Sequence, residues 1–175
     1  MSNFRDEAVK LVVDNGLRDL CEVGVWQGDL ARMLAPLERT LVLVDPWSAL
    51  WNNFMLADGR VYDCTMGGPV QSQHALNRMH DDLRDELPDA LILRMPSAEA
   101  VKHVPPGSLD FVFIDAVHLF EYSWNDLKSW ENRLRRPGIL AGDDYCGEVK
   151  EAVDRFSDSR LLNLEVENNV WRFLL

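Results

Sequence analysis

Four side chains that can carry chemistry follow two apolar runs in the second half of the sequence. They are Asp115, His118, Asp143 and Asp144. Asp115 follows the run 111–114, and the aspartate pair follows the run 138–142. If both runs are parallel strands, their carboxyl ends share one edge of a sheet, where open α/β sheets bind ligands. Three carboxylates there would repel one another unless a cation lay between them, and hard cations prefer oxygen ligands. The pattern therefore predicts a Mg²⁺ or Mn²⁺ site, with His118 as a candidate base beside it.

Each of these residues also has an interpretation that involves no metal. The pair Asp143-Asp144 is also typical of a loop turn, and His118 is also typical of a helix cap. The combination of three aspartates and a histidine at two strand ends favours the metal site. Zinc is disfavoured, because no cysteine or second histidine lies at ligand spacing.

A second pattern, nearer the N-terminus, combines an acidic residue with two glycines: Glu22, Gly24 and Gly28, with Trp26 between the glycines. A dinucleotide fingerprint would also require glycine where Trp26 and Asp29 stand, and Trp26 would hinder the close approach of a pyrophosphate. The pattern instead suits a ligand without phosphates, such as S-adenosylmethionine. Gly24 would let the backbone approach this ligand, and Glu22 would face its positively charged amino end.

Three further residues extend this predicted cofactor site. Asp45 ends an apolar run, where a carboxylate can accept hydrogen bonds from both hydroxyls of a ribose. Ser97 and Ala98 follow another apolar run and are expected near the adenine. A helix cap before Pro46 is the alternative for Asp45. The complete predicted set is Glu22, Gly24, Trp26, Gly28, Asp45, Ser97, Ala98 and Asp115.

Alternating strands and helices are predicted to position these residues. Strands are predicted over 20–25, 40–45, 90–94, 109–115 and 138–142, and helices over 2–15, 28–36, 70–87, 120–134 and 149–156. Ser2 and Gly16 are predicted to bound the first helix, and Pro137-Gly138 to end the helix over 120–134. The chain closes with a predicted hairpin, 161–166 and 170–175, whose strands must be antiparallel. The predicted fold is α/β and Rossmann-like: a seven-stranded sheet, mostly parallel with one antiparallel strand from this C-terminal hairpin, and helices on both faces.

Length and composition narrow the class of protein. The 175 residues predict one domain, 1–175, and the net charge of −11 argues against nucleic acid and anionic membranes as partners. Three cysteines without a pairing pattern predict a cytoplasmic setting. The start of the sequence lacks the layout of a signal peptide, and no apolar run is long enough to span a membrane.

The segment 46–88 is predicted to contain the lid or substrate-binding part. Its aromatic and sulfur-containing side chains should overhang the carboxyl edge of the sheet. They are Trp47, Trp51, Phe54, Met55, Tyr62 and Met66. Flat aromatic faces suit sugar rings or aromatic substrates, but packing under the segment or a subunit contact explains Trp47 and Trp51 equally well. The substrate is predicted to be a hydroxylated small molecule, and a homo-oligomer is left open.

The ordered motifs resemble a known family. They are Glu-Val-Gly-Val-Trp-x-Gly at 22–28, Val-Asp-Pro-Trp at 44–47, Phe-Ile-Asp-Ala-x-His at 113–118 and Ala-Gly-Asp-Asp-Tyr at 141–145. Over about residues 18–175 the chain is similar to class I S-adenosylmethionine-dependent methyltransferases, and within them to the Mg²⁺-dependent O-methyltransferases that act on macrolide sugars. Cephalosporin-cluster hydroxylase-like proteins are related to this group.

The resemblance implies a role for each residue of the carboxyl edge. Asp115, Asp143 and Asp144 would be the metal ligands and His118 the general base. The implied function is transfer of a methyl group to a hydroxyl of a small molecule, such as a sugar or another polyhydroxylated compound. Two alternatives stay open: a metal-dependent hydroxylase-like or hydrolytic enzyme on the same fold, and a non-catalytic module that binds an adenosyl ligand.

Overall fold

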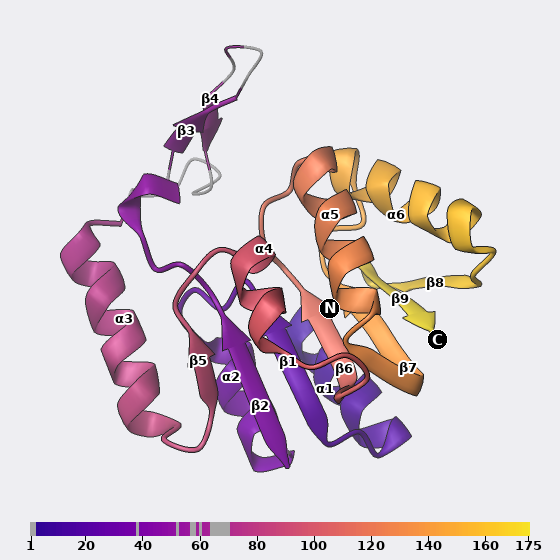
Figure 1. Cartoon of the computed structure of the whole chain (residues 1–175), viewed down its shortest axis with the longest axis horizontal. Helices are drawn as coiled ribbons and strands as arrows, with labels where there is room; N and C mark the ends of the chain where they lie inside the picture. The colour runs from indigo at the N-terminus through magenta and orange to yellow at the C-terminus, as the bar shows by residue number, and fades with distance from the viewer. Residues whose placement is uncertain (1–2, 38, 52, 57–58, 60, 64–70) are drawn as a thin grey trace.

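The computed structural model describes residues 3–37, 39–51, 53–56, 59, 61–63 and 71–175. Its centre is a seven-stranded sheet in the order β5-β2-β1-β6-β7-β9-β8 (Figure 1). The strands are β1 Asp19–Val23, β2 Thr40–Val44, β5 Leu91–Leu93, β6 Leu109–Ile114, β7 Leu134–Gly142, β8 Leu164–Glu167 and β9 Val170–Leu174. Neighbours from β5 to β7 are parallel, and β9 is antiparallel to both β7 and β8. The predicted Rossmann-like sheet with one antiparallel strand is confirmed.

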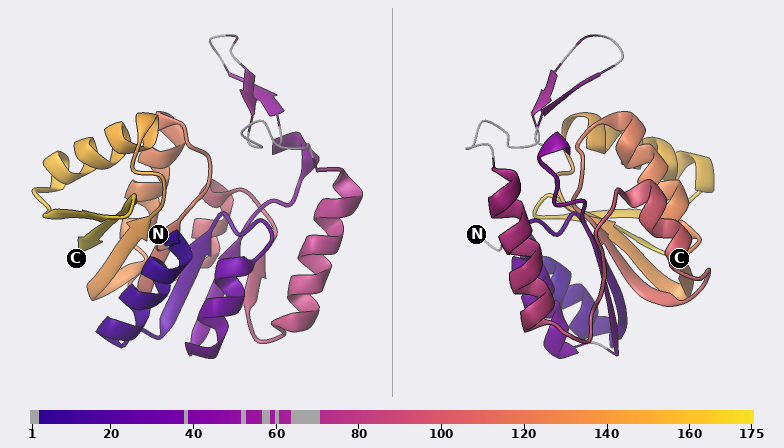
Figure 2. Two further views of the ribbon diagram at one scale, coloured as in Figure 1. Left: turned by 180° about the vertical axis from the view of Figure 1, so that it is seen from behind. Right: turned by 60° about the vertical axis from the view of Figure 1, so that its left-hand side comes forward.

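Helices cover both faces of this sheet (Figure 2). They are α1 Phe4–Asn15, α2 Asp29–Leu34, α3 Gln73–Glu86, α4 Ser97–Ala100, α5 Phe120–Glu131 and α6 Gly147–Arg160, with short 3₁₀ turns η1 Ala35–Leu37, η2 Ala49–Trp51 and η3 Val101–His103. One hydrophobic core joins the sheet to α1, α2 and α3, and the other joins it to α4, α5 and α6. The central strands are therefore buried on both sides, which explains why their sequences are nearly continuous apolar runs.

The predicted end of the first helix and the predicted C-terminal turn are both confirmed by the backbone geometry. Gly16 ends α1 in the left-handed conformation, with φ of 63°. The C-terminal hairpin turns at Asn168 and Asn169, whose φ angles of 50° and 71° are those that asparagine tolerates in tight turns. The start of α1 is capped by Asn3, whose side chain accepts a hydrogen bond from Arg5 N, whereas the predicted cap Ser2 lies outside the described residues.

The prediction that Pro137-Gly138 ends a helix was wrong. Helix α5 ends at Glu131, and β7 already begins at Leu134, so the proline and glycine lie inside this strand. Leu134 continued the helical spacing of Trp130, and both side chains are buried in the same core, so spacing could not separate helix from strand here. The pairing of β6 with β7 shifts register between Leu109 and Phe111, opposite this part of β7.

No strand was predicted in the segment 46–69, but it contains a two-stranded hairpin. Strand β3, Asn53–Met55, pairs antiparallel with β4, Val61–Asp63, and the pair projects above the main sheet (Figure 1). Strands of three residues are too short to show an alternating pattern in a sequence. Met66, which was predicted to belong to the lid or substrate-binding segment, lies outside the described residues. No helix of the described residues is long and apolar enough to cross a membrane.

Candidate functional site

The ends of β1, β6 and β7 bring the candidate catalytic residues to one edge of the sheet. In the strand register, Val23 lies beside Ile114, and Ile114 lies beside Gly142. One residue further, Asp115 N donates to the carbonyl oxygen of Val23 at 2.8 Å, and Asp143 N donates to that of Ile114 at 3.2 Å. The backbone hydrogen bonds of the sheet thus continue one residue past the strands, and they fix the main-chain positions of Asp115 and Asp143.

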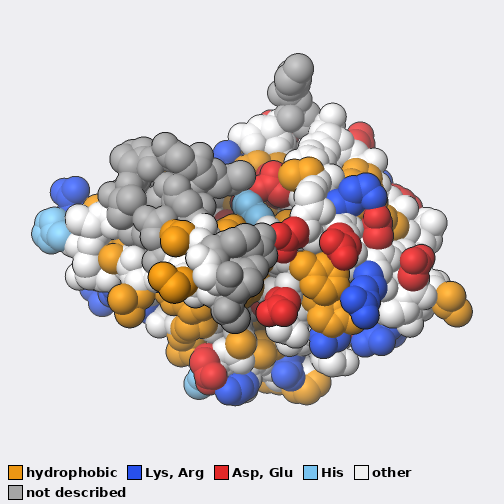
Figure 3. Space-filling view, turned by 90° about the horizontal axis from the view of Figure 1, so that it is seen from above, with side chains coloured by type: hydrophobic (Ala, Val, Ile, Leu, Met, Phe, Trp, Pro, Cys, Tyr) orange, Lys and Arg blue, Asp and Glu red, His pale blue; other side chains and the backbone are white. Residues whose placement is uncertain are grey.

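His118 lies between two of the aspartates. Its Nε2 is 3.3 Å from Asp115 Oδ1, and its Nδ1 is 3.3 Å from Asp144 Oδ2. One ligand atom from each of these three residues lies within 4.8 Å of the others, which is close enough for all three to contact one cation. All three side chains are half-buried, and Figure 3 shows acidic side chains around a histidine on the face above the sheet.

The surroundings raise the pKa values of both His118 and Asp143. Burial lowers the pKa of His118, but its hydrogen bond to Asp115 and the charges of Asp144 and Asp143 outweigh burial, so the net shift is upward. Burial, assisted by the charges of Asp115 and Asp144, raises the pKa of Asp143 to about 6. In both shifts the neighbouring carboxylates act in the same direction, and a cation among them would relieve this repulsion.

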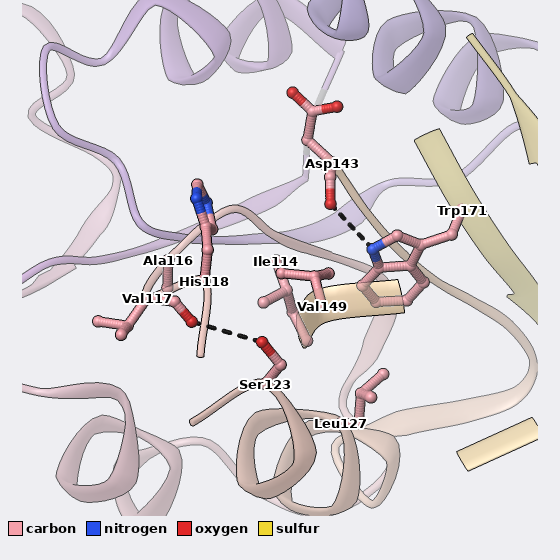
Figure 4. A pocket seen from close by; sticks show the side chains of 9 residues that line it. All are labelled: Ile114, Ala116, Val117, His118, Ser123, Leu127, Asp143, Val149 and Trp171. Atoms are coloured by element: carbon pink, nitrogen blue, oxygen red, sulfur yellow. Dashed lines mark hydrogen bonds between the residues drawn. The ribbon is translucent and has the colours of Figure 1, made fainter. Parts of the chain in front are cut away.

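Asp143 is held differently from the other three residues. It is not a member of the three-residue ligand cluster, although it lies next to it in the chain. Its backbone carbonyl accepts a hydrogen bond of 3.0 Å from Trp171 Nε1 (Figure 4). A small cavity of about 10 Å³, room for about one water molecule, lies below Asp143 and His118, and Figure 4 shows both side chains pointing away from Leu127 at its base. The structure thus brings Asp115, Asp144 and His118 together, with Asp143 beside them.

Two residues that the sequence analysis did not assign hold the loop between β6 and α5. Tyr62, in β4, accepts a hydrogen bond of 2.8 Å from the backbone N–H of His118 through its hydroxyl oxygen. Glu148, in α6, accepts one of 2.9 Å from the backbone N–H of Phe120 through Oε2. Tyr62 had been noted only as part of an aromatic segment, and no pattern in the sequence pointed to Glu148.

Glu22 is a buried carboxyl group beside this cluster. Among the described residues no hydrogen-bond partner reaches its Oε2, and its side chain is nearly inaccessible. Burial raises the pKa of Glu22 well above its ordinary value, and the charges of Asp115 and Asp45 raise it further. A buried polar atom without a partner is costly, so this oxygen marks a place where a ligand donor would be favourable.

The two glycines of the same turn are required by the packing of the protein itself. A Cβ atom on Gly24, whose φ is +94°, would lie 1.8 Å from the carbonyl oxygen of Asp115. A Cβ atom on Gly28, whose φ is +80°, would lie 2.3 Å from the Leu83 side chain in α3. Gly24 therefore lets the end of β1 pass close against the end of β6. This brings the glycine turn, where the cofactor is predicted to bind, next to Asp115.

Asp45 organises the turns that follow β1 and β2. Its Oδ2 accepts a hydrogen bond of 2.9 Å from Trp26 N, and its Oδ1 accepts one of 2.7 Å from Trp47 N. The Trp47 indole is buried and donates to the Trp26 carbonyl oxygen at 2.8 Å, so it packs in the core rather than in a lid. Trp26 has φ of 48°, and its side chain is 52% exposed. A carboxylate has about four acceptor sites, so Asp45 keeps capacity for further donors.

Ser97 begins α4, beyond the end of β5, while Ala98 beside it is exposed. The Ser97 hydroxyl donates to Asp126 Oδ1 at 2.5 Å and accepts from Trp130 Nε1 at 2.8 Å. Burial raises the pKa of Asp126 to about 6. The hydroxyl of Ser97 is therefore used within the protein. The residue lies at the edge of the sheet, where the adenine was predicted, but its hydroxyl already has these two partners.

Comparison with known proteins identifies the family. Residues 21–145 match the family model described as a methyltransferase domain. This chain belongs to the methyltransferase domain family. The matched residues include Glu22, the glycine turn and Asp45. They also include the three-residue ligand cluster of Asp115, His118 and Asp144, which we call the acidic cluster. The predicted class of enzyme, a methyltransferase, is confirmed, while the sequence matches no curated protein.

Solved structures show the same fold. The O-methyltransferase NovP is 20% identical, with a TM-score of 0.70 over 98% of this chain and 77% of that chain. The O-methyltransferase from Bacillus cereus in complex with SAH is 12% identical, with a TM-score of 0.62 over 100% and 82%. The calicheamicin methyltransferase CalS11 is 15% identical, with a TM-score of 0.63 over 98% and 77%. The similarity to class I methyltransferases found in the motifs therefore extends to the complete fold.

Proposed function

We propose that this methyltransferase transfers a methyl group from S-adenosylmethionine to a hydroxyl oxygen of a small molecule, with Mg²⁺ or Mn²⁺ at the acidic cluster. The observation that carries the proposal is the position of His118 between Asp115 and Asp144, at the strand edge where the Gly24 turn meets Asp115. A base, a set of oxygen ligands and the predicted cofactor turn then lie at one place, as methyl transfer to an oxygen requires.

The cofactor half of the proposal is supported by the carboxylates around the Gly24 turn. Glu22 has a buried oxygen without a hydrogen-bond partner among the described residues, which suits the amino group of the cofactor, and Asp45 has spare acceptor capacity for ribose hydroxyls. Two structures of similar fold, the Bacillus cereus enzyme and a Podospora anserina methyltransferase, are described as bound to SAH, the demethylated product. When bound, S-adenosylmethionine supplies the methyl group.

The metal half is supported by the donor set. Asp115 and Asp144 offer carboxylate oxygens, Asp143 offers a third beside them, and oxygen ligands are those that Mg²⁺ prefers. When bound, the cation would lower the pKa of the acceptor hydroxyl. The protein's own part is proton removal: His118 takes the proton through a ring nitrogen, and its two aspartate neighbours orient the ring and favour its charged form.

The acceptor is proposed to be a polyhydroxylated small molecule, such as a sugar. One similar structure is described as a TDP-rhamnose 3′-O-methyltransferase. The net charge of −11 disfavours nucleic acid and anionic membranes as partners, and a cytoplasmic location and a single domain over 1–175 remain predictions from the sequence.

Methyl transfer from labelled S-adenosylmethionine tests the proposal directly. TDP-rhamnose and catechol are suitable probe acceptors, because both carry neighbouring hydroxyls on a ring. We expect label to reach an acceptor oxygen with Mg²⁺ present and the rate to fall when EDTA removes the cation. Cofactor binding without transfer to either probe, together with hydrolysis or hydroxylation of the probe, would replace the proposal with one of the alternative enzyme classes. Equal rates with and without EDTA would remove the metal.

Replacing Asp45 by alanine should weaken binding of S-adenosylhomocysteine. The loss of acceptors for the ribose hydroxyls is expected to cost about 1–3 kcal/mol, or about 5- to 150-fold in Kd. Isothermal titration calorimetry measures this change, and the exposed Asp85→Ala in α3 is the matched control. Because Asp45 also holds Trp26 and Trp47, the melting temperature is measured in parallel. An unchanged Kd in a folded Asp45→Ala protein would place the ribose elsewhere.

Mg²⁺ should raise the melting temperature, since a ligand that binds only the folded state stabilises it. At about 100 times its Kd the stabilisation is about 2.7 kcal/mol, which corresponds to about 5–10 °C for a chain of this size. Asp144→Asn removes one carboxylate of the cluster and should reduce the shift, whereas Glu151→Gln, exposed on α6, should keep it. Differential scanning fluorimetry with Mg²⁺, Mn²⁺ and Ca²⁺ is the measurement, and a melting curve indifferent to all three would contradict the metal site.

A further inference from the structure

The backbone of the proposed base is attached to the β3–β4 hairpin. The hydroxyl oxygen of Tyr62 in β4 accepts the hydrogen bond from His118 N at 2.8 Å, across the gap between the hairpin and the start of α5. This contact joins segments 56 residues apart in the sequence. In Figure 1 the hairpin rises above the carboxyl edge of the sheet.

Aromatic packing holds Tyr62 in this place. The Tyr62 ring lies 5.4 Å from that of Phe54, its partner in the hairpin register, and Phe54 lies 5.7 Å from Tyr122 in α5. Trp51 closes the group, 5.4 Å from Phe54 and 6.2 Å from Tyr122. We call these four residues the aromatic cluster. An isolated two-stranded hairpin is marginally stable in water, so the position of this hairpin depends on such contacts.

The hydrogen bond meets a need of the loop that carries the base. Backbone N–H groups just before a helix have no partner within the helix, and a partly buried one requires an acceptor from elsewhere. Glu148 fills this role for Phe120 N, and Tyr62 fills it for His118 N. The aspartates orient the ring of His118, whereas Tyr62 fixes the main chain from which the ring projects.

We propose that Tyr62 is a positioning residue that couples docking of the β3–β4 hairpin to placement of the His118 main chain. The tether itself is a property of the fold, and its effect on the reaction rests on the function proposed above. With the hairpin docked, the N–H of His118 is paired and the base stands over the acidic cluster. With the hairpin displaced, that N–H loses its acceptor and the base loses its fixed position. Docking of the hairpin and placement of the base thus become one event.

Amide hydrogen exchange of the full-length protein, followed by NMR, tests the tether without any substrate. Tyr62→Phe keeps the ring in the aromatic cluster and removes the hydroxyl that accepts from His118 N, so exchange at the His118 amide should become about 2- to 12-fold faster, the range for one net hydrogen bond. Tyr122→Phe is the matched control, because it removes a hydroxyl from the same cluster without touching His118 N. We expect it to leave that exchange rate unchanged. Unchanged exchange in Tyr62→Phe, or equal acceleration in both variants, would overturn the tether.

The coupling to the base is tested by the rate of methyl transfer, measured with whichever of the two probe acceptors becomes labelled. Tyr62→Phe should lower kcat about 2- to 12-fold, by the loss of one hydrogen bond, and leave KM for S-adenosylmethionine unchanged. The same substitution in a His118→Ala background should have no further effect, because the residue through which Tyr62 acts is gone. An equal loss in both backgrounds would overturn the positioning role. Full activity of His118→Ala alone would remove His118 as the base, and the absence of any labelled acceptor would refute the proposed function. In either case the exchange result would still decide the tether.

Discussion

Replacing His118 by alanine should slow methyl transfer by about 10²- to 10⁴-fold, the usual cost of losing a general base. The loss should appear in kcat more than in the KM for S-adenosylmethionine, because His118 lies among the aspartates and not at the Asp45 turn. Part of the rate should return at high pH, where the acceptor hydroxyl ionises without assistance. Steady-state kinetics between about pH 6 and pH 10 measure both effects.

The control for this variant is a histidine outside the site. His103, exposed in η3, can be replaced by alanine with little expected change in rate or in its pH dependence. Binding of S-adenosylhomocysteine and the Mg²⁺-induced rise in melting temperature should survive largely intact in His118→Ala. An enzyme that keeps its full rate at neutral pH without His118 would leave proton removal to another group.

Replacing Gly24 by alanine should destabilise the protein by about 2–5 kcal/mol, the sum of a positive-φ penalty and overpacking against rigid backbone. The new Cβ would lie 1.8 Å from the Asp115 carbonyl oxygen and 3.0 Å from Ala116 Cα, both backbone atoms with little freedom to move. Relief of this clash must separate the ends of β1 and β6. Denaturant unfolding measures the stability, and the Mg²⁺-induced shift in melting temperature should shrink in the same variant because Asp115 is displaced.

Gly107→Ala isolates the conformational part of this effect. Gly107 also has a positive φ, +65°, but a Cβ atom there would meet nothing within 4 Å. Its substitution should therefore cost only about 1–2 kcal/mol, the penalty for a left-handed backbone with a side chain. If Gly24→Ala proved no more harmful than Gly107→Ala, the close contact between the two strand ends would not constrain the site as we infer.

Patterns local to the sequence were sufficient for the main sheet. Strands buried on both faces read as apolar runs, and each run ended next to a polar residue that the fold places at the carboxyl edge. The Asn168-Asn169 turn predicted the antiparallel strand, because asparagine tolerates the backbone that a tight turn needs. Leu134 and Pro137 show where this reasoning ends: helical spacing ran past the end of α5, and only pairing with β6 and burial in the core made that stretch a strand.

The candidate site divides in the same way. The residue types and their positions after strands were enough to predict Asp115, His118, Asp143 and Asp144 as one group, since parallel strands align their ends. Side-chain directions were decided by the tertiary structure: His118 lies between Asp115 and Asp144, with Asp143 outside the three-residue cluster. The tethers of the loop, Tyr62 and Glu148, come from elements distant in sequence, and a contact between distant segments leaves no periodic trace in either of them.

The sequence by itself determined the sheet and the residues that follow its strands, because these depend on burial and on where each strand ends. The class of enzyme came from the resemblance of its ordered motifs to a known family. Only the tertiary structure decided why Gly24 must be glycine, that Trp47 is a core residue, and that a short hairpin holds the backbone of the proposed base. These features depend on distances between atoms of separate elements. Such distances are set by how the two cores pack, which the spacing of residues along one chain does not specify.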